Sequence, residues 1–269
     1  HIPNFSYYGN TLNTGPVYNI FKRSDAKNLH NKVAVIGLGA GTFAAYGKDG
    51  QSFIFYEIDP EVKLIANNHE YFTFIKTSKA NISFVMGDAR KTLEKAQDYE
   101  YGIIFVDVYS DFSIPKSFIT IEAINLYLRK LQKNGLIVMH ITTEEDGIES
   151  IIGRIAQELE LAAYVMCIDE YIDDTKESTS GLITRKADTN AWYSKLYKNL
   201  LLLFGIKSFS SDKNISKWVI IARNKEDLLD LTSDHGWHML SVDSNQEILT
   251  DESIEYGESA RGIITRKIT

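Results

Sequence analysis

The alternation of apolar runs with amphipathic segments between residues 32 and 168 constrains the fold of this chain more than any other feature. Apolar runs typical of strands lie at residues 32–38, 52–58, 82–88, 101–108, 135–142 and 162–168. Segments with helical spacing lie between them, at residues 59–72, 89–97, 120–132 and 148–161. Strands that are apolar throughout and alternate with helices indicate βαβ units, in which helices cover both faces of a parallel sheet. The sequence therefore predicts an α/β fold with a doubly wound, mostly parallel sheet.

The pattern changes after residue 168, where a polar stretch begins. Beyond this stretch, segments typical of a helix, a strand and a short helix follow at residues 191–204, 217–223 and 225–232. We expect an N-terminal extension, one large domain and a C-terminal tail packed on that domain, at residues 1–30, 31–232 and 233–269.

Composition excludes several classes of protein. The net charge of −7 disfavours nucleic acid as the main partner, because phosphate binding needs a basic face. No apolar run approaches the length of about 18 residues that a membrane span needs, so we expect no membrane contact within the chain. The single cysteine, Cys167, lies in an apolar run and is expected to be a buried thiol. No Cys and His spacing indicates a metal site. We expect a cytoplasmic protein or, since position 1 is not Met, the soluble domain of a longer membrane-anchored one.

Ligands of an open parallel sheet bind outside the carboxyl ends of its strands, so the residues that follow each strand are the candidate site. After the first strand come Gly37, Gly39, Ala40 and Gly41. Their G-x-G-x-G spacing differs from the dinucleotide fingerprint G-x-G-x-x-G, which has its third glycine where this chain has Thr42. Taken alone, the glycines fit either a tight turn or a nucleotide loop.

The acidic residues after the next two strands favour the nucleotide interpretation. Glu57 ends the second strand, where a carboxylate can accept hydrogen bonds from both hydroxyls of a ribose. Asp88 follows the third strand and has two interpretations, a neighbour of adenine and an N-cap for a helix that begins at Ala89. Together with Ile58, these residues complete the predicted adenosyl-binding set.

The segment VDVYSDFSIP, residues 106–115, is the predicted reaction segment. Asp107, Tyr109 and Asp111 supply two carboxylates and a phenol, which can hold an ammonium group and take its proton. The alternative is an ordinary loop, because Asp is a good turn residue. His140 ends the fifth strand and fits a hydrogen-bonded core histidine more readily than an acid–base residue.

Further acidic residues follow the fifth and sixth predicted strands. They are either solvated loop residues or a negative rim that attracts a polycation. They are Glu144, Glu145, Asp146, Asp169, Glu170, Asp173 and Asp174.

Several stretches resemble one known family. VAVIGLGAGTFAAY, FYEIDP, MGDAR and the run from VDVYSDFSIP to GLIVMHIT are similar to the spermidine synthase-like branch of the class I S-adenosylmethionine-dependent methyltransferase fold. The similarity extends to the catalytic domains that are fused to transporter-like membrane segments. It covers about residues 5–145 well and only patches beyond.

The resemblance implies a Rossmann-like fold and a role for each candidate residue. An adenosyl group would lie over Gly37, Gly39 and Gly41, with its ribose on Glu57 and its adenine near Asp88. Asp107 falls where aminopropyltransferases keep the acid that orients and deprotonates the attacking amine.

The resemblance also implies substrates. They are S-adenosylmethionine or its decarboxylated form as donor and a small amine as acceptor, as in polyamine biosynthesis. We expect no metal, and a homodimer is one open arrangement of the chain. Spermidine synthases carry an aspartate in the glycine loop that holds the aminopropyl ammonium, whereas this chain has Ala40. This difference keeps intact S-adenosylmethionine open as the donor, for methyl transfer, cyclisation or elimination. An adenosyl-binding domain without turnover is a further alternative, and an NAD oxidoreductase is disfavoured by Thr42.

Overall fold

The structure is a computed structural model. It describes residues 31–109, 114–142, 147–170, 214–232, 236–243 and 245–254, together with Val17, Ile20 and Phe21. The chain divides into two compact units, His1–Ile168 with Ile215–Thr269, and Asp169–Asn214. Of the second unit, the structure describes only residues 169, 170 and 214.

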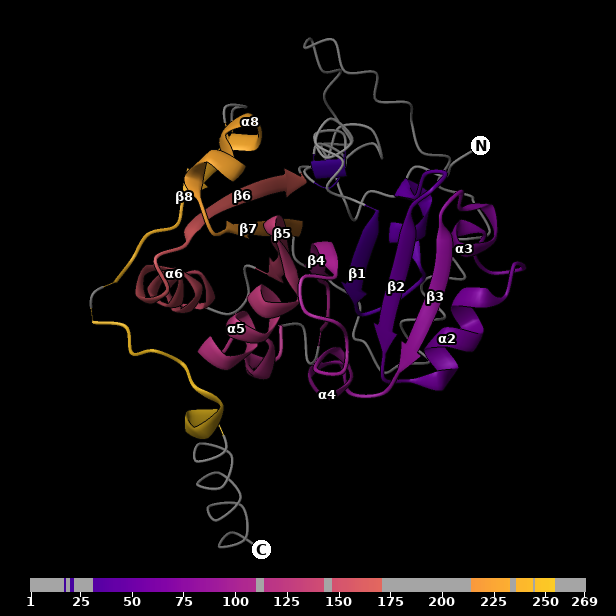
Figure 1. The fold of residues 1–269 in the computed structure, drawn as a ribbon, viewed down its shortest axis with the longest axis horizontal. Coiled ribbons are helices and arrows are strands. Elements are labelled where there is room, and N and C mark those ends of the chain that lie inside the picture. Colours follow the sequence, from indigo (N-terminus) through magenta and orange to yellow (C-terminus); the bar gives the residue numbers. More distant parts are fainter. Residues whose placement is uncertain are drawn as a thin grey trace, which may run out of the picture. The chain divides into compact units, whose positions relative to one another are not determined.

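The described strands form one eight-stranded sheet in the order β3-β2-β1-β4-β5-β7-β6-β8 (Figure 1). The strands are β1 (Lys32–Ile36), β2 (Ser52–Glu57), β3 (Asn81–Met86), β4 (Tyr101–Val106), β5 (Leu131–Thr142), β6 (Ala162–Glu170), β7 (Asn214–Ala222) and β8 (Trp237–Met239). Strands β1 to β5 pair with their neighbours in parallel, whereas β7 runs antiparallel to β5 and β8 antiparallel to β6. The predicted α/β fold with a mostly parallel sheet is confirmed.

Helices cover both faces of this sheet. The described α-helices are α2 (Pro60–Asn67), α3 (Phe74–Thr77), α4 (Ala89–Leu93), α5 (Ile121–Lys130), α6 (Ile148–Glu158) and α8 (Leu229–Thr232). The short 3-10 helices are η2 (Thr42–Tyr46), η3 (Lys116–Phe118) and η4 (Lys225–Asp227). One apolar cluster joins the sheet to α4, α5 and α6, and a second joins its other face to η2, α2, α3 and α8.

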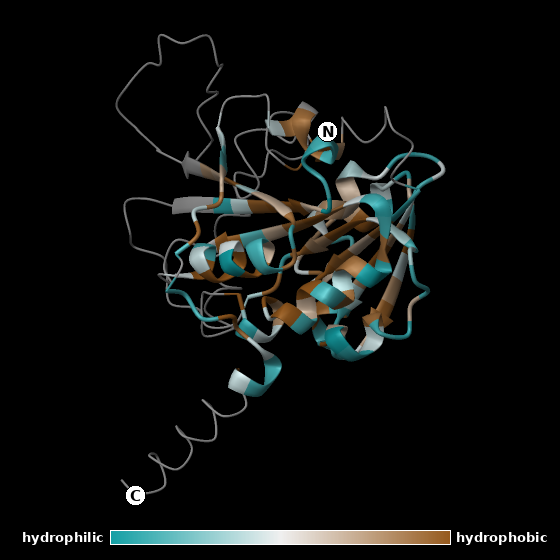
Figure 2. Cartoon of the chain, turned by 60° about the vertical axis from the view of Figure 1, so that its left-hand side comes forward, coloured by the Kyte–Doolittle hydropathy of each residue, from teal (hydrophilic) through white to brown (hydrophobic). Residues whose placement is uncertain are grey.

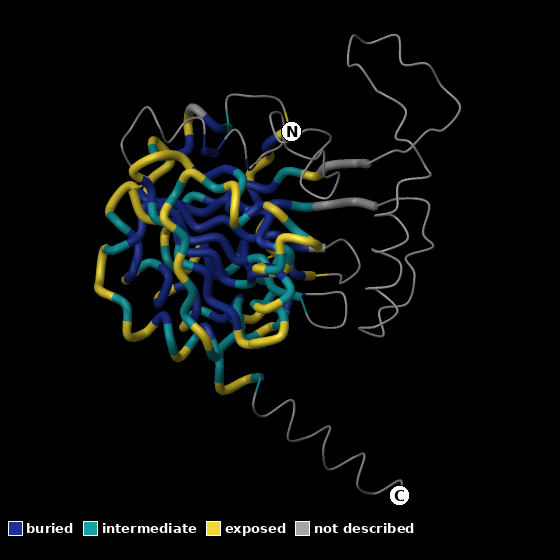
Figure 3. Tube along the Cα trace, turned by 90° about the vertical axis from the view of Figure 1, so that its right-hand side faces the viewer, coloured by how far each residue is buried: buried dark blue, intermediate teal, exposed yellow. Residues whose placement is uncertain are grey.

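The strands are apolar on both sides because both clusters are built from them. In β1, Ala34 and Ile36 point into the first cluster, and Val33 and Val35 point into the second. Figure 2 shows the strands as hydrophobic and the helices as mixed, and Figure 3 shows the buried strands inside a more exposed shell. Burial on both faces is what makes each strand an uninterrupted apolar run in the sequence.

Part of the predicted N-terminal extension belongs to the second cluster. The Phe21 ring stacks on Tyr46 and Phe53, with ring centroids 5.3 and 5.6 Å apart. Val17 and Ile20 are fully buried beside it. The domain boundaries themselves stay a prediction.

Several predicted boundaries are wrong by a few residues. The helix expected over 59–72 ends at Asn67, because the Asn68 side chain accepts a hydrogen bond from the Glu70 N–H in a local turn that competes with the helix. The helix expected over 89–97 ends at Leu93. Strand β5 begins at Leu131 rather than at residue 135, with a register shift against β4 near its start.

Two expectations about the C-terminal half also need correction. The tail predicted at residues 233–269 contributes strand β8, which was not predicted from the sequence. Cys167 is exposed rather than buried. The helix expected over 191–204 lies outside the described residues. None of the described helices is long and apolar enough to cross a membrane.

A substitution at Gly37 tests how closely the backbone after β1 approaches the backbone after β4. Its φ is +94°, and a Cβ there would lie 2.2 Å from the Asp107 carbonyl oxygen. Gly37→Ala is therefore expected to lower the free energy of unfolding by about 3 kcal/mol, from backbone strain and the clash together. Urea unfolding measures this loss.

Gly50→Ala is the matched control. Gly50 also has a positive φ, +85°, but among the described residues no atom lies within 4 Å of a Cβ built there. Its cost is expected to be about 1–2 kcal/mol, from the backbone conformation alone. Equal losses in the two variants would contradict the close contact between Gly37 and Asp107.

Candidate functional site

The parallel register of β1 with both neighbours aligns the residues that follow these strands. Ile36 pairs with Tyr56 on one side and with Val106 on the other. One step further along, Gly37 therefore lies between Glu57 and Asp107. Two backbone hydrogen bonds fix this alignment. The Gly37 N–H donates to Tyr56 O, and the Asp107 N–H donates to Ile36 O, each at 2.9 Å.

The same alignment continues across β5 and β7. Val106 pairs with Met139, so the next residues, Asp107 and His140, are neighbours. His140 in turn pairs with Trp218 on the antiparallel β7. We call this line of residues at the carboxyl edge the edge row: Glu57, Gly37, Asp107, His140 and Trp218. Since side chains alternate along a strand, the edge row faces the same side of the sheet as Phe55, Val35, Phe105 and Val138.

The three glycines of the loop after β1 have different surroundings. Gly37 is pressed against the Asp107 carbonyl, and a Cβ on Gly41 would lie 2.9 Å from the Ile75 side chain. Gly39, with a φ of +50°, has none of the described atoms within 4 Å of such a Cβ. Close packing therefore explains Gly37 and Gly41, whereas no contact within the described residues explains Gly39. The neighbouring Ala40 packs partly against the second apolar cluster.

Glu57 is a nearly buried carboxylate held at this loop. One of its oxygens, Oε2, accepts a hydrogen bond from the Leu38 N–H (3.1 Å), and Oε1 accepts one from the Asp59 N–H (2.8 Å). A carboxylate oxygen has two lone pairs, so each can accept a further donor. Ile58 follows with 69% of its surface exposed, which leaves a large apolar side chain in water beside the carboxylate.

Asp88 forms the helix cap that was one of its two interpretations. Its Oδ1 accepts a hydrogen bond from the Arg90 N–H (2.9 Å) and caps α4, which starts at the buried Ala89. Asp59 caps α2 in the same way, since its side chain accepts a hydrogen bond from the Glu61 N–H. A cap uses one carboxylate oxygen, so the second interpretation of Asp88, next to adenine, stays a prediction.

Asp107 and His140 form a side-chain pair that the sequence did not indicate. The His140 Nδ1 lies 2.9 Å from Asp107 Oδ1, and the two side chains are 3% and 12% exposed. The imidazole stacks on the Trp218 indole, with ring centroids 4.3 Å apart and planes 6° from parallel. The Tyr109 ring meets the imidazole edge-on, at 5.3 Å and 85°. The three side chains thus hold the imidazole from different directions.

This cluster contains residues that sequence reasoning judged differently or missed. His140 is a buried, hydrogen-bonded residue, as its expected core role required, but its partner is a predicted catalytic residue. Trp218 was missed, because only the antiparallel pairing of β7 brings it to the edge row. The signal available in the sequence was a lone histidine at the end of an apolar strand.

Some predicted site residues lie outside the described part of the chain. They are Asp111, Glu144, Glu145, Asp146, Asp173 and Asp174. Asp169 and Glu170 end strand β6, but their side chains are not described. Among the described residues, no three His, Cys, Asp or Glu side chains gather closely enough to hold a metal ion.

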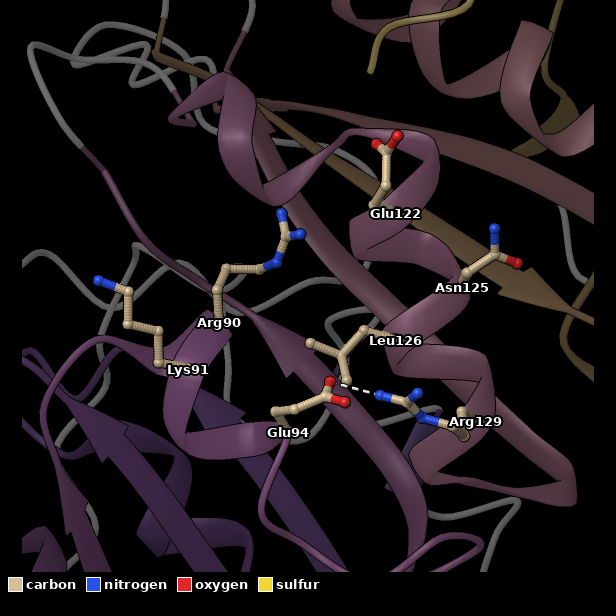
Figure 4. A pocket seen from close by; sticks show the side chains of 7 residues that line it. All are labelled: Arg90, Lys91, Glu94, Glu122, Asn125, Leu126 and Arg129. Carbon is tan, nitrogen blue, oxygen red and sulfur yellow. Dashed lines mark hydrogen bonds and ion pairs between the residues drawn. The ribbon is translucent and has the colours of Figure 1, made fainter. Parts of the chain in front are cut away.

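An open groove of about 600 Å³ lies between α4 and α5 rather than along the edge row (Figure 4). Its charged side chains are largely paired: Glu94 points toward Arg129 and accepts its hydrogen bond. Arg90 projects from α4 and binds residues of the C-terminal segment. A groove whose charges are compensated in this way offers a ligand few unsatisfied partners.

The C-terminal segment is bound to both walls of this groove through Asp251. Its carboxylate accepts hydrogen bonds from both terminal nitrogens of Arg90 (3.2 and 2.7 Å) and from the Thr120 hydroxyl (2.6 Å). Arg90 also donates to Ser117 O, just after the predicted reaction segment. The Ile121 N–H donates to Leu249 O at 2.9 Å. The tail thus links the helix capped by Asp88 to the helix that follows the reaction segment.

This network gives a pH-dependent contribution to stability. Partial burial raises the pKa of the Asp251 carboxyl, but the hydrogen bonds from Arg90 and Thr120 and the charge of Arg90 outweigh it and bring the pKa below its usual value. The stabilisation is therefore complete above the pKa of the unfolded carboxyl, about 3.9, and is lost as the pH falls through the lower pKa of the folded one.

Asp251→Asn tests this contribution. At pH 7 we expect a loss of at most about 1 kcal/mol, because the side chain is 43% exposed and solvent screens the pair. The difference from the wild type should disappear once the pH is below the folded pKa of Asp251. Urea unfolding at several pH values measures it, with the exposed Asp49→Asn as control. A difference that persists unchanged at low pH would contradict the ion pair as its cause.

Comparisons with known proteins identify the fold. No protein-family profile matches the chain. Over 124 residues it is 29% identical to a probable polyamine aminopropyl transferase of Bifidobacterium longum, and the match covers 45% of this chain and 26% of that protein. The chain thus spans about a quarter of the length of this curated relative.

Comparison with solved structures concerns the fold alone. The chain is similar to a spermidine synthase in complex with the transition-state analogue AdoDATO, with 15% identity, 75% of this chain and 59% of that chain covered, and a TM-score of 0.50. It is also similar to a probable spermidine synthase of Corynebacterium glutamicum, with 16% identity, 81% and 70% covered, and a TM-score of 0.48. The chain has the class I S-adenosylmethionine-dependent methyltransferase fold and resembles its polyamine aminopropyltransferase branch.

Proposed function

We propose that this chain, which has the methyltransferase fold and resembles the aminopropyltransferase branch, transfers an aminopropyl group to an amine. The donor is decarboxylated S-adenosylmethionine, and the acceptor is a small amine. The observation that carries the proposal is the edge row, in which carboxylates on neighbouring strands flank Gly37. Glu57 serves the donor and Asp107 serves the acceptor.

The surroundings of Glu57 support the adenosyl half of the proposal. Its carboxylate accepts hydrogen bonds from the two ribose hydroxyls, in addition to the backbone N–H groups that it already binds. The exposed Ile58 gives an apolar surface for the adenine ring, and Asp88 accepts from its exocyclic amine. Gly39 lets the adenosyl group approach the backbone closely. A spermidine synthase of the same fold binds AdoDATO, a transition-state analogue.

Asp107 is the proposed base. The acceptor enters as an ammonium ion, and Asp107 takes one of its protons, which gives a neutral amine. The nitrogen lone pair then attacks the carbon next to the sulfonium, the C–S bond breaks, and its electrons stay on sulfur as a neutral thioether. The products are a secondary ammonium ion, methylthioadenosine and a proton on Asp107. Tyr109 and Asp111 orient the acceptor.

Ala40 favours a second candidate function. A carboxylate at this position would bind the ammonium of the decarboxylated donor and repel the carboxylate of intact S-adenosylmethionine. Ala40 does neither, so the same edge row also suits intact S-adenosylmethionine as donor. The reaction would then be methyl transfer, or attack from within the donor that gives cyclisation or elimination.

Product analysis tests these alternatives. With decarboxylated S-adenosylmethionine and a panel of diamines, we expect methylthioadenosine and an aminopropylated amine, measured by mass spectrometry. With intact donor, S-adenosylhomocysteine would indicate methyl transfer, and methylthioadenosine would indicate cyclisation or elimination. Asp107→Asn, which cannot take the proton, is expected to lower kcat by about 10²-fold or more. Binding of either donor without formation of any product would contradict the proposed transferase activity and indicate an adenosyl-binding domain without turnover.

Gly39→Ala and Gly50→Ala form a matched pair that tests the adenosyl site without turnover. Both glycines have a positive φ, and neither Cβ would meet a described atom within 4 Å. The two substitutions should therefore cost similar stability. Only Gly39→Ala adds a methyl group where the donor is proposed to approach, and calorimetry should show donor affinity at least about tenfold weaker. Equal affinity in both variants would contradict the proposed position of the donor.

A further inference from the structure

We infer that His140 is a positioning residue of the site. It holds the Asp107 carboxylate in the orientation in which this carboxylate can take the proton of the acceptor. The inference rests on the proposed function, in which Asp107 is the base. His140 acts through its hydrogen bond to Asp107 Oδ1, at 2.9 Å. It is not proposed to touch the substrate.

Packing alone does not account for a histidine at this place. The ring is stacked on Trp218 and meets Tyr109 edge-on, and a phenylalanine ring would make the same kinds of contact. Burying an imidazole costs free energy unless it is hydrogen-bonded, and His140 is 2% exposed. What the imidazole adds over an apolar ring is its two nitrogens, and one of them, Nδ1, faces Asp107.

The aromatic contacts fix the direction of that nitrogen. Trp218 lies opposite His140 in the β5–β7 register, and the two rings are 6° from parallel. Tyr109, at 85°, restricts the imidazole from a second direction. A ring held in this way keeps Nδ1 at one position relative to the end of β4. Trp218 and Tyr109 thus act on Asp107 indirectly, through His140.

Asp107 needs such a partner because of where it lies. It follows β4, whose six residues are all buried, and its own side chain is 12% exposed. A carboxylate with so little water around it is stabilised by hydrogen-bond donors, and a donor also fixes its rotamer. Proton transfer requires the base within hydrogen-bond reach of the acceptor nitrogen, and a misplacement of about 1 Å can cost on the order of 10²-fold in rate.

Two substitutions of His140 separate the hydrogen bond from the packing. His140→Phe keeps a ring between Trp218 and Tyr109 but removes the donor. His140→Asn removes the ring but keeps an N–H near the position of Nδ1. We expect His140→Phe to lower kcat on the order of 10²-fold, with the KM for the donor unchanged, and His140→Asn to retain kcat within about tenfold. The matched control is His238→Phe, the same substitution at an exposed residue of β8.

A double-mutant cycle tests whether His140 acts through Asp107. In an Asp107→Asn background, His140→Phe is expected to cause little further loss of kcat, because the carboxylate through which His140 acts is already replaced. Additive losses would overturn the inference. So would a His140→Phe enzyme with wild-type kcat, or a folded His140→Asn enzyme that loses as much as His140→Phe. If His140→Phe does not fold, a folded His140→Asn enzyme whose kcat falls by more than about tenfold overturns the inference by itself and assigns the role of His140 to packing.

A structural readout separates this inference from the proposed function. If the wild type produces nothing from any donor and amine, the proposed function fails. Crystal structures of the two variants still test His140 directly. The Asp107 carboxylate is expected to turn away from its wild-type direction in His140→Phe and to keep it in His140→Asn. An unmoved carboxylate in His140→Phe would overturn the positioning role whatever the reaction is.

Discussion

The parallel pairing of β1 with both of its neighbours is the constraint on which the candidate site depends. Each pairing fixes which residue lies beside Gly37 at the carboxyl ends of the strands, Glu57 on one side and Asp107 on the other. The pairing of β5 with β4 and β7 extends the line to His140 and Trp218. A shift of one residue in any of these registers would turn side chains to the opposite face and separate these groups.

Groups in this site serve the fold and the proposed chemistry together. Gly37 is required by the close approach of the Asp107 carbonyl, and Asp88 caps a helix. Glu57 binds two backbone N–H groups and so holds the glycine loop against the end of β2. Gly39 differs, because no described neighbour explains the missing side chain. A residue that packing does not explain is a better indicator of a ligand than one that packing requires.

The fold class and the identity of most candidate residues were predictable from local pattern. Strands buried on both faces appear as apolar runs, and acids that follow such runs lie at the carboxyl edge of a parallel sheet. Helix ends were less predictable, since the turn at Asn68 competes with continued helix. The link between Arg90 and Asp251 joins residues 161 positions apart, and no local pattern indicates such a contact.

The sequence by itself determined the α/β class, the glycine loop and the set of acids, because each depends on residues near one another in the chain. Only the tertiary structure decided which of these residues are neighbours. Asp107 meets His140 because β4 and β5 are adjacent and in register, and His140 meets Trp218 because β7 runs antiparallel beside β5. Strand order, register and the antiparallel direction of β7 are set by the packing of the whole sheet, and local sequence does not encode them. Cys167 is exposed, although its apolar surroundings in the sequence predict a buried thiol.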